Sequence, residues 1–162
     1  MTLALLRRSA PVAIALVAAL ALPASSMARQ AAPDAPVASG ARSGLTIKAA
    51  SSRFGTILVD GSGRTLYLFT ADRGKTSRCY GACARTWPVA DAKGAPRAGA
   101  GVRRSLIGRT RRSDGRLQVT YRGRPLYYFV NEPAGRVLCQ NADEFGGLWL
   151  VVRPDGRAVR GG

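Results

Sequence analysis

The alternation of hydrophobic and polar positions predicts short β-strands through most of the chain beyond residue 44. Two runs rich in β-branched residues, 45–49 and 55–60, are bounded by Ser and Gly, as strands usually are. The glycines that follow residue 60 indicate a tight turn, since glycine adopts positive φ without a steric penalty. The run 65–70 then predicts a third strand. Its side chains are largely apolar on both faces, so we expect this strand to be central and covered on both sides.

The same pattern occurs a second time further along the chain. The segment 63–72, with the sequence GRTLYLFTAD, reappears at 123–132 as GRPLYYFVNE, an offset of 123 − 63 = 60 residues. The same offset relates Val59 to Val119, so the register continues outside the motif without a gap. A constant offset over this length indicates a tandem duplication.

The second copy predicts three strands of its own, at 106–110, 116–121 and 125–130. In the middle strand Gln118 and Thr120 alternate with apolar neighbours, which indicates one solvent-facing side. A single three-stranded meander is marginally stable, whereas two that pack together bury a shared core. We therefore predict a mainly β fold in which two tandem, pseudo-symmetric three-stranded antiparallel meanders pack as one small domain.

The segments that follow the meanders predict further elements. Ser77 is a typical helix N-cap residue and Pro88 a stop signal, so we predict a short helical turn at the Cys-x-x-x-Cys segment. On such a turn Trp87 would face the core. The stretch 90–101, rich in Ala, Gly and Pro, predicts a surface loop between the repeats. After the second meander, 146–152 predicts another strand.

The N-terminal sequence is typical of an export signal. Arg7 and Arg8 precede an apolar run, and the small residues Ser26 and Ala28 follow it. The run is shorter than the about 20 apolar residues that a membrane span needs, so we predict a cleaved signal peptide over residues 1–28. The mature chain would then have no transmembrane segment and would lie outside the cytoplasm, in the periplasm or at the cell exterior.

The rest of the chain divides into a linker and one domain. Residues 29–43 contain mostly Ala, Pro, Ser and Gly, which bury too little surface to offset their ordering entropy, so we predict a disordered linker. Residues 44–162 have the length of a single domain. Within it, the two repeats would cover about 45–104 and 105–162.

The net charge bears on which partners the protein binds. The chain has 25 basic and nine acidic residues and a formal net charge of +16. Such an excess attracts polyanions, so we expect contacts with anionic envelope polymers or lipid head groups. Our candidates for these contacts are Arg109, Arg111 and Arg112, and ordinary solvated strand ends are the alternative. We do not expect nucleic acid as a partner, because exported proteins rarely meet it. The sequence does not define an oligomeric state.

Catalytic and cofactor chemistry finds little support in the sequence. Histidine is absent, which removes the usual general base and the commonest metal ligand. No glycine-rich phosphate loop lies between a strand and a helix. A zinc site needs four ligands, and although the three cysteines with Asp72 or Asp143 could supply them, the Cys-x-x-x-Cys spacing is not that of a usual zinc site. We therefore predict no enzyme activity, no cofactor and no metal site.

The cysteines are the sharpest chemical question, because an odd number in an exported protein leaves one thiol over. Three internal pairs are possible: Cys79 with Cys83, Cys79 with Cys139, and Cys83 with Cys139. We expect a structural bond between Cys79 and Cys83 if Gly81 opens the turn between them. A strained, reducible bond at the same place would instead indicate a redox function.

The acids at the end of the duplicated motif, Asp72 and Glu132, allow an acid–base interpretation, since paired carboxylates can share such work. The simpler interpretation is that each acid caps the turn after its strand. The motif aromatics are likewise expected to form the core. As motif residues with a structural role more than a functional one we single out Tyr67, Phe69, Asp72, Trp87, Tyr127, Phe129, Glu132 and Trp149.

These motifs together resemble a known family. A Y-x-F-x-x-D signature at residues 67–72 is followed by the Cys-x-x-x-Cys pair and a Trp-Pro dipeptide, and the second copy carries PLYYF at 125–129 and GLW at 147–149. With these features the chain resembles the bacterial secreted repeats of unknown function, predicted lipoproteins with a Yx(F/W/Y)xxD motif. The chain differs from that description in having Glu132 at the second acid position and no lipidation cysteine.

The resemblance implies a secreted repeat without an assigned activity. Combined with the basic charge, it favours a non-enzymatic binding or envelope-structural module that meets anionic envelope polymers. The alternative is an extracytoplasmic redox accessory protein that uses the cysteines.

Overall fold

The computed structural model describes residues 43–161. The predicted signal peptide and almost all of the predicted linker lie outside the described residues. The described part contains nine β-strands, a short α-helix and a 3₁₀-helix: β1 Ser43–Ser52, β2 Gly55–Asp60, β3 Tyr67–Phe69, α1 Ala82–Thr86, β4 Ala95–Ala98, η1 Arg104–Leu106, β5 Ile107–Arg111, β6 Leu117–Tyr121, β7 Arg124–Pro125, β8 Ala142–Glu144 and β9 Gly147–Val151. The mainly β fold is therefore confirmed.

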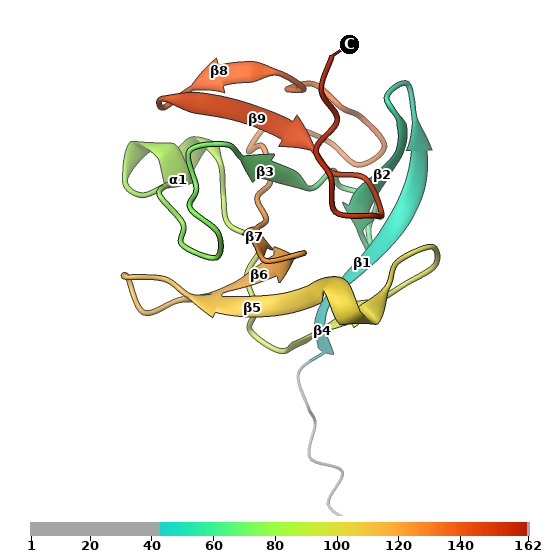
Figure 1. The fold of residues 1–162 in the computed structure, drawn as a ribbon, viewed down its shortest axis with the longest axis horizontal. Helices are drawn as coiled ribbons and strands as arrows, with labels where there is room; N and C mark the ends of the chain where they lie inside the picture. Colours follow the sequence, from blue (N-terminus) through green and yellow to red (C-terminus); the bar gives the residue numbers. More distant parts are fainter. Residues whose placement is uncertain (1–42, 162) are drawn as a thin grey trace, which may run out of the picture. The chain divides into compact units, whose positions relative to one another are not determined.

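The strands form three small sheets, with the orders β2-β1-β4, β5-β6-β7 and β3-β9-β8 (Figure 1). In the first repeat, β1 and β2 form an antiparallel hairpin, and β4 adds to β1 in parallel. In the second repeat, β5, β6 and β7 form the predicted antiparallel meander. The first repeat also returns to its hairpin after the turn, but only through a bridge between Val59 and Thr65.

The two repeats interlock by exchanging segments that follow their motifs. Strand β9, from the end of the second repeat, pairs antiparallel with β3 of the first. In the opposite direction, the segment 86–90 of the first repeat runs beside 126–130 of the second, where Ala90 N–H donates to Leu126 O and Tyr128 N–H to Pro88 O. Each repeat is thus completed by a segment of the other repeat.

The motif strands separate two hydrophobic cores. Leu66 and Leu68 lie in one core, and Tyr67 and Phe69 in the other, all 1% exposed or less. Because alternate side chains of a strand point to opposite faces, this arrangement requires a strand that is covered on both sides. The structure therefore confirms that this strand is covered on both faces, but β3 is the terminal strand of its sheet and meets the second repeat on its other side only through a bridge between Tyr67 and Tyr127.

The register of the duplication needs one correction. Ile47 pairs with Asp60 in the first repeat, and Ile107 pairs with Tyr121 in the second, so β2 matches β6 at an offset of 121 − 60 = 61. The offset returns to 60 in the motif because the turn before it is one residue longer in the first repeat. Val59 is therefore not the structural equivalent of Val119, as the ungapped alignment predicted.

The middle strand of the second repeat has no wet face, contrary to the prediction. Gln118 and Thr120 are 0% and 1% exposed. Gln118 is buried without an unmet hydrogen bond because its amide donates to Leu126 O at 2.8 Å and its carbonyl oxygen accepts from Arg112 at 2.8 Å. A pattern of alternating polarity cannot reveal such internal partners.

Two predictions for the segment between the repeats were also wrong. The stretch 90–101 is not only a surface loop, since it contains β4, and Ala90 and Ala92 are buried. Helix α1 is capped by Gly81, whose φ of 55° lies in the left-handed region that glycine favours, and not by Ser77. Ser77 is instead buried, and its hydroxyl serves other partners.

Candidate functional site

The two motif copies pair reciprocally through hydrogen bonds between their tyrosines and their acids. The Tyr67 hydroxyl of the first copy donates to Glu132 Oε1 of the second at 2.6 Å. The Tyr127 hydroxyl of the second copy donates to Asp72 Oδ2 of the first at 2.8 Å. Each tyrosine therefore bonds the acid of the other repeat and not the acid of its own motif.

The acids also hold the turns that follow their own strands. Asp72 Oδ1 accepts the backbone N–H of Arg78 at 2.8 Å, and Glu132 Oε1 accepts the backbone N–H of Leu138 at 2.5 Å. Each acid thus accepts from a backbone N–H that lies six residues further along the chain. These bonds support the interpretation that the acids cap turns, and the bonds to tyrosine add a link between the repeats.

The backbone and the motif arginines repeat this exchange. Tyr67 and Tyr127 pair through two backbone hydrogen bonds of 2.9 Å, each residue donating its N–H to the other's carbonyl. Arg64 donates to the carbonyl of Phe129 at 3.2 Å, and Arg124 donates to the carbonyl of Phe69 at 3.1 Å. The motif is therefore a structural connector that works through a pseudo-twofold arrangement of its two copies.

Burial shifts the pKa values of the motif acids and of the motif tyrosines in the same direction. Burial raises the pKa of both Asp72 and Glu132, although the hydrogen bonds they accept oppose the shift. Burial also raises the pKa of Tyr67 and of Tyr127, with the neighbouring carboxylate adding to the effect. With exposures of 7% and 4%, the two acids have little access to a substrate, so the arrangement favours a structural role over acid–base catalysis.

The motif aromatics form a four-ring column between the repeats. Trp87 stacks on Trp149 with ring centroids 3.9 Å apart and an interplanar angle of 3°. Phe69 stacks on the other face of Trp149, with ring centroids 4.1 Å apart. The ring centroid of Phe129 lies 5.1 Å from that of Trp87. Each tryptophan therefore packs against the other tryptophan and against the phenylalanine of the opposite repeat, and both indole rings are fully buried.

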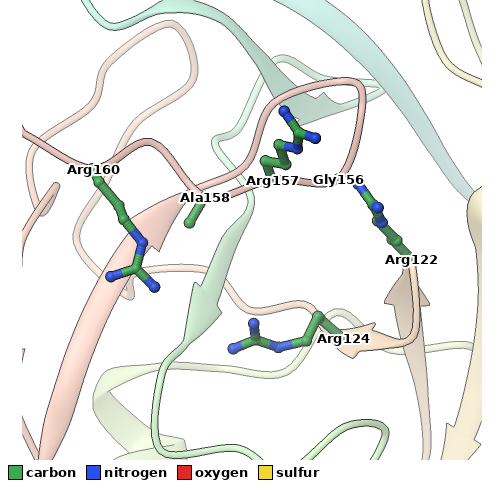
Figure 2. A pocket seen from close by; sticks show the side chains of 6 residues that line it. All are labelled: Arg122, Arg124, Gly156, Arg157, Ala158 and Arg160. Atoms are coloured by element: carbon green, nitrogen blue, oxygen red, sulfur yellow. The ribbon is translucent and has the colours of Figure 1, made fainter.

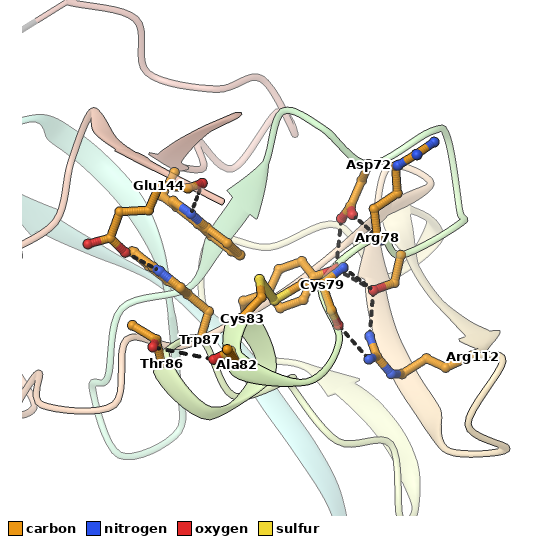
Figure 3. The surroundings of a disulfide bond; sticks show 12 residues. Asp72, Arg78, Cys79, Ala82, Cys83, Thr86, Trp87, Arg112 and Glu144 are labelled. Carbon is orange, nitrogen blue, oxygen red and sulfur yellow. Dashed lines mark hydrogen bonds between the residues drawn. A yellow bond between two sulfur atoms is a disulfide. The ribbon is translucent and has the colours of Figure 1, made fainter. Parts of the chain in front are cut away.

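Glu144 bonds the indole N–H groups of both tryptophans in the column. Its carboxylate accepts the Nε1–H of Trp87 at 2.8 Å, and its backbone carbonyl accepts the Nε1–H of Trp149 at 3.3 Å (Figure 3). A buried indole N–H needs such a partner. Glu144 lies outside the repeated pattern, so its role was not predicted from the sequence.

The cysteines adopt the structural arrangement that we expected. Cys79 and Cys83 form a disulfide beside α1, and they are 0% and 6% exposed. Cys139 is free and half-buried, and burial, with Glu132 and Glu144 nearby, raises the pKa of its thiol to about 11. A thiol that is mostly protonated at neutral pH is a poor nucleophile. These features favour a structural role for the disulfide over a redox function.

Arg112 requires a correction to the polyanion candidates. Its side chain is buried, and its guanidinium donates to the Ser77 hydroxyl, to Gln118 Oε1 and to the carbonyl of Cys79 (Figure 3). Its Nε also bonds Asp114 at 3.1 Å. With every donor group committed inside the protein, Arg112 connects the disulfide segment to β6 and does not reach a surface ligand. An isolated run of arginines in a sequence gives no signal that one of them points inward.

The other two candidates, Arg109 and Arg111, lie exposed on β5. Arg111 donates to the carbonyl of Gly115 at 3.0 Å across the hairpin. Among the described residues no helix has the length and apolar character to cross a lipid bilayer. The same residues contain no group of three or more His, Cys, Asp or Glu side chains that could hold a metal ion.

The comparison with protein families finds the same duplication. Residues 48–91 and 108–153 each match the family described as a secreted repeat of unknown function. The chain belongs to this family. The two matches fall within the repeats predicted from the sequence, and the description agrees with an exported protein. Searches of curated proteins and of solved structures gave no match.

Proposed function

We propose that this chain is a secreted, non-enzymatic binding or envelope-structural module whose basic surface contacts anionic envelope polymers. The observation that carries the proposal is that the acidic motif groups are buried while the basic side chains are mostly exposed. The motif acids and tyrosines are buried and bonded to each other across the repeats, whereas Arg109, Arg111 and most other basic side chains lie at the surface.

The acids cannot neutralise this surface. Asp60, Asp72 and Glu132 are buried and accept internal hydrogen bonds, so they offer little charge to the exterior. Among the described residues, the acids that form ion pairs are Asp91, Asp114 and Asp155. An uncompensated basic surface attracts polyanions over a distance set by ionic screening.

The proposal predicts binding that depends on salt. The mature protein should bind a soluble glycerol-phosphate oligomer at low ionic strength, and the affinity should fall steeply as the Debye length shortens to about 8 Å at physiological salt. Charge reversal by Arg109→Glu with Arg111→Glu should weaken binding without changing the melting temperature much. Titration calorimetry over a salt series tests this expectation. If no binding occurs at low salt, the arginine excess is only a compositional feature and the proposal is wrong.

A further inference from the structure

Four arginines line one hollow at the end of the second repeat. The hollow has a volume of about 460 Å³ and is lined by Arg122, Arg124, Gly156, Arg157, Ala158 and Arg160. Two turns frame it, the one between β6 and β7 and the one at residues 153–157. Figure 2 shows Arg124 and Arg160 extending toward the same opening from opposite sides.

The charge in this hollow is poorly compensated. Its lining among the described residues contains no carboxylate, although Asp155 lies 3.8 Å from Arg157 and the buried Asp72 interacts electrostatically with Arg124. Arg122 donates to the backbone carbonyl of Asp155 at 3.0 Å. Like charges that gather without counter-charges repel each other, so the arrangement is costly unless an anion occupies it.

The comparison of the two repeats identifies what Arg124 lacks. Its counterpart Arg64 has its guanidinium 4.4 Å from the centre of the Tyr128 ring, and the Tyr128 hydroxyl donates to Asp60. For Arg124, the residue equivalent to Tyr128 is Leu68 of the first repeat, since 128 − 60 = 68. Tyr121 takes the place of Asp60, because these residues pair with Ile107 and Ile47 respectively.

Arg124 therefore keeps a carbonyl bond like that of Arg64. It has no aromatic ring at the position equivalent to Tyr128 and no carboxylate at the position equivalent to Asp60. Its Nε is buried and has no hydrogen-bond partner among the described residues. A buried donor without a partner costs free energy, so the second repeat stabilises its motif arginine less completely than the first repeat does. This donor belongs to a residue that lines the hollow.

The backbone holds part of the hollow in place before any ligand binds. Arg122 has a φ of 47°, in the left-handed region that non-glycine residues seldom adopt. Gly156 packs so closely against it that an added Cβ would lie 2.6 Å from Arg122 Cβ. The two turns are therefore fixed against each other, and pre-organised donors bind an anion with less loss of entropy.

We propose that Arg122, Arg124, Arg157 and Arg160 form a specific site for a phosphate group of an anionic envelope polymer. The site rests on the proposed function and gives it a location. The planar guanidinium fork matches the oxygens of a phosphate group, and several forks around one hollow select a group with more than one negative charge. A polymer fits better than a lipid surface, because the exposed large hydrophobic residues, Val130, Leu138 and Phe145, do not line the hollow.

The first test compares two pairs of exposed arginines at about 0.15 M salt, where diffuse attraction is screened. Arg157→Gln with Arg160→Gln removes two charges from the hollow, and Arg73→Gln with Arg85→Gln removes two charges elsewhere. Titration calorimetry with inorganic pyrophosphate and with a soluble glycerol-phosphate oligomer measures the affinity. We expect the hollow pair to lose about tenfold per arginine and the control pair to lose little.

The second test keeps the charge and changes only the geometry. Arg124→Lys removes the buried Nε and the fork, and Arg64→Lys makes the same change at the equivalent position of the first repeat. Both variants lose a bond to a motif carbonyl, so both should lower the melting temperature by a similar amount. Only Arg124→Lys should weaken binding of pyrophosphate and of the oligomer, by about tenfold.

The outcomes separate the site from the general proposal. Equal losses in the hollow pair and the control pair would show that only total charge matters, which overturns the site but leaves the proposed function standing. Absence of binding to every probe, including at low salt, would overturn both. Vesicles of phosphatidylcholine with phosphatidylglycerol test the source of the phosphate, and tighter binding to them than to the oligomer would overturn the polymer assignment.

Discussion

The exchange of tyrosine–acid bonds makes a prediction that the position of the motif in the sequence would not suggest. Tyr67 lies five residues before Asp72, yet its hydroxyl bonds Glu132. Removing the hydroxyl with Tyr67→Phe leaves a ring of nearly the same size and deletes the bond to a buried carboxylate, together with a long bond of 3.4 Å that the hydroxyl accepts from the N–H of Cys139. Hydrogen bonds to charged groups contribute about 1.5–3 kcal/mol. Because Glu132 keeps the N–H of Leu138, we expect a loss of about 2 kcal/mol.

Chemical unfolding in urea measures this loss, and a double-mutant cycle assigns it to a partner. Tyr67→Phe combined with Glu132→Gln should be non-additive by about 1–2 kcal/mol, because the two side chains share one bond. Tyr67→Phe combined with Asp72→Asn should be additive within about 0.5 kcal/mol. Tyr80→Phe is the control for loss of a tyrosine hydroxyl, since that hydroxyl only accepts a bond from Ser113 at the surface.

The mirror cycle, Tyr127→Phe with Asp72→Asn, should behave in the same way as the first. Coupling between Tyr67 and Asp72 together with additivity between Tyr67 and Glu132 would refute the exchange, since each motif would then bond within itself. Unchanged stability of both phenylalanine variants would show that the hydroxyl bonds contribute nothing.

The remaining predictions concern pH, the disulfide and the buried arginine. Because burial raises the pKa of Glu132 above its ordinary value of 4.5, and that of Asp72 likewise, the folded state binds more protons than the unfolded state just above pH 4.5, so the free energy of unfolding should rise as pH falls from neutrality toward that value. Urea titrations over this range should show a smaller rise in the variant Asp72→Asn with Glu132→Gln. Replacing both cysteines of the disulfide, Cys79→Ser with Cys83→Ser, should cost about 2 kcal/mol in the same assay, since the bond closes a short loop. Arg112→Gln should cost about 3 kcal/mol because it breaks a buried charged network, while Arg111→Gln at the exposed neighbouring position should stay within about 0.5 kcal/mol.

The sequence predicts the parts of this fold that depend on local pattern. Alternation along 65–70 is sufficient to show that the strand is covered on both sides, and the repeated motif is sufficient to predict two related units. The pattern of hydrophobic and polar residues does not show which segment of the chain a strand pairs with. The pairing of β3 with β9, and of 86–90 with 126–130, follows from the packing of both repeats together.

The candidate site follows the same division. The repeated acids and aromatics were found because they recur, but Ser77, Gln118 and Glu144 have no counterpart in the repeat and were missed as partners. Arg112 was misplaced for a related reason. Its burial depends on Gln118 Oε1 and the carbonyl of Cys79, which come from two distant segments. The motif arginines Arg64 and Arg124 did recur, and their repetition was the available signal that they have a role.

The interlocked motif also restricts where a function can reside. Each tyrosine, acid, arginine and tryptophan of the motif finds its partner in the opposite repeat, so these side chains are committed to holding the two copies together. A group that is saturated by internal bonds has nothing left to offer a ligand. Function must then depend on positions where the copies differ. Arg64 and Arg124 bond equivalent carbonyls, but only Arg64 has Tyr128 beside it, and the nitrogen that Arg124 leaves without a partner belongs to a residue that lines the arginine hollow.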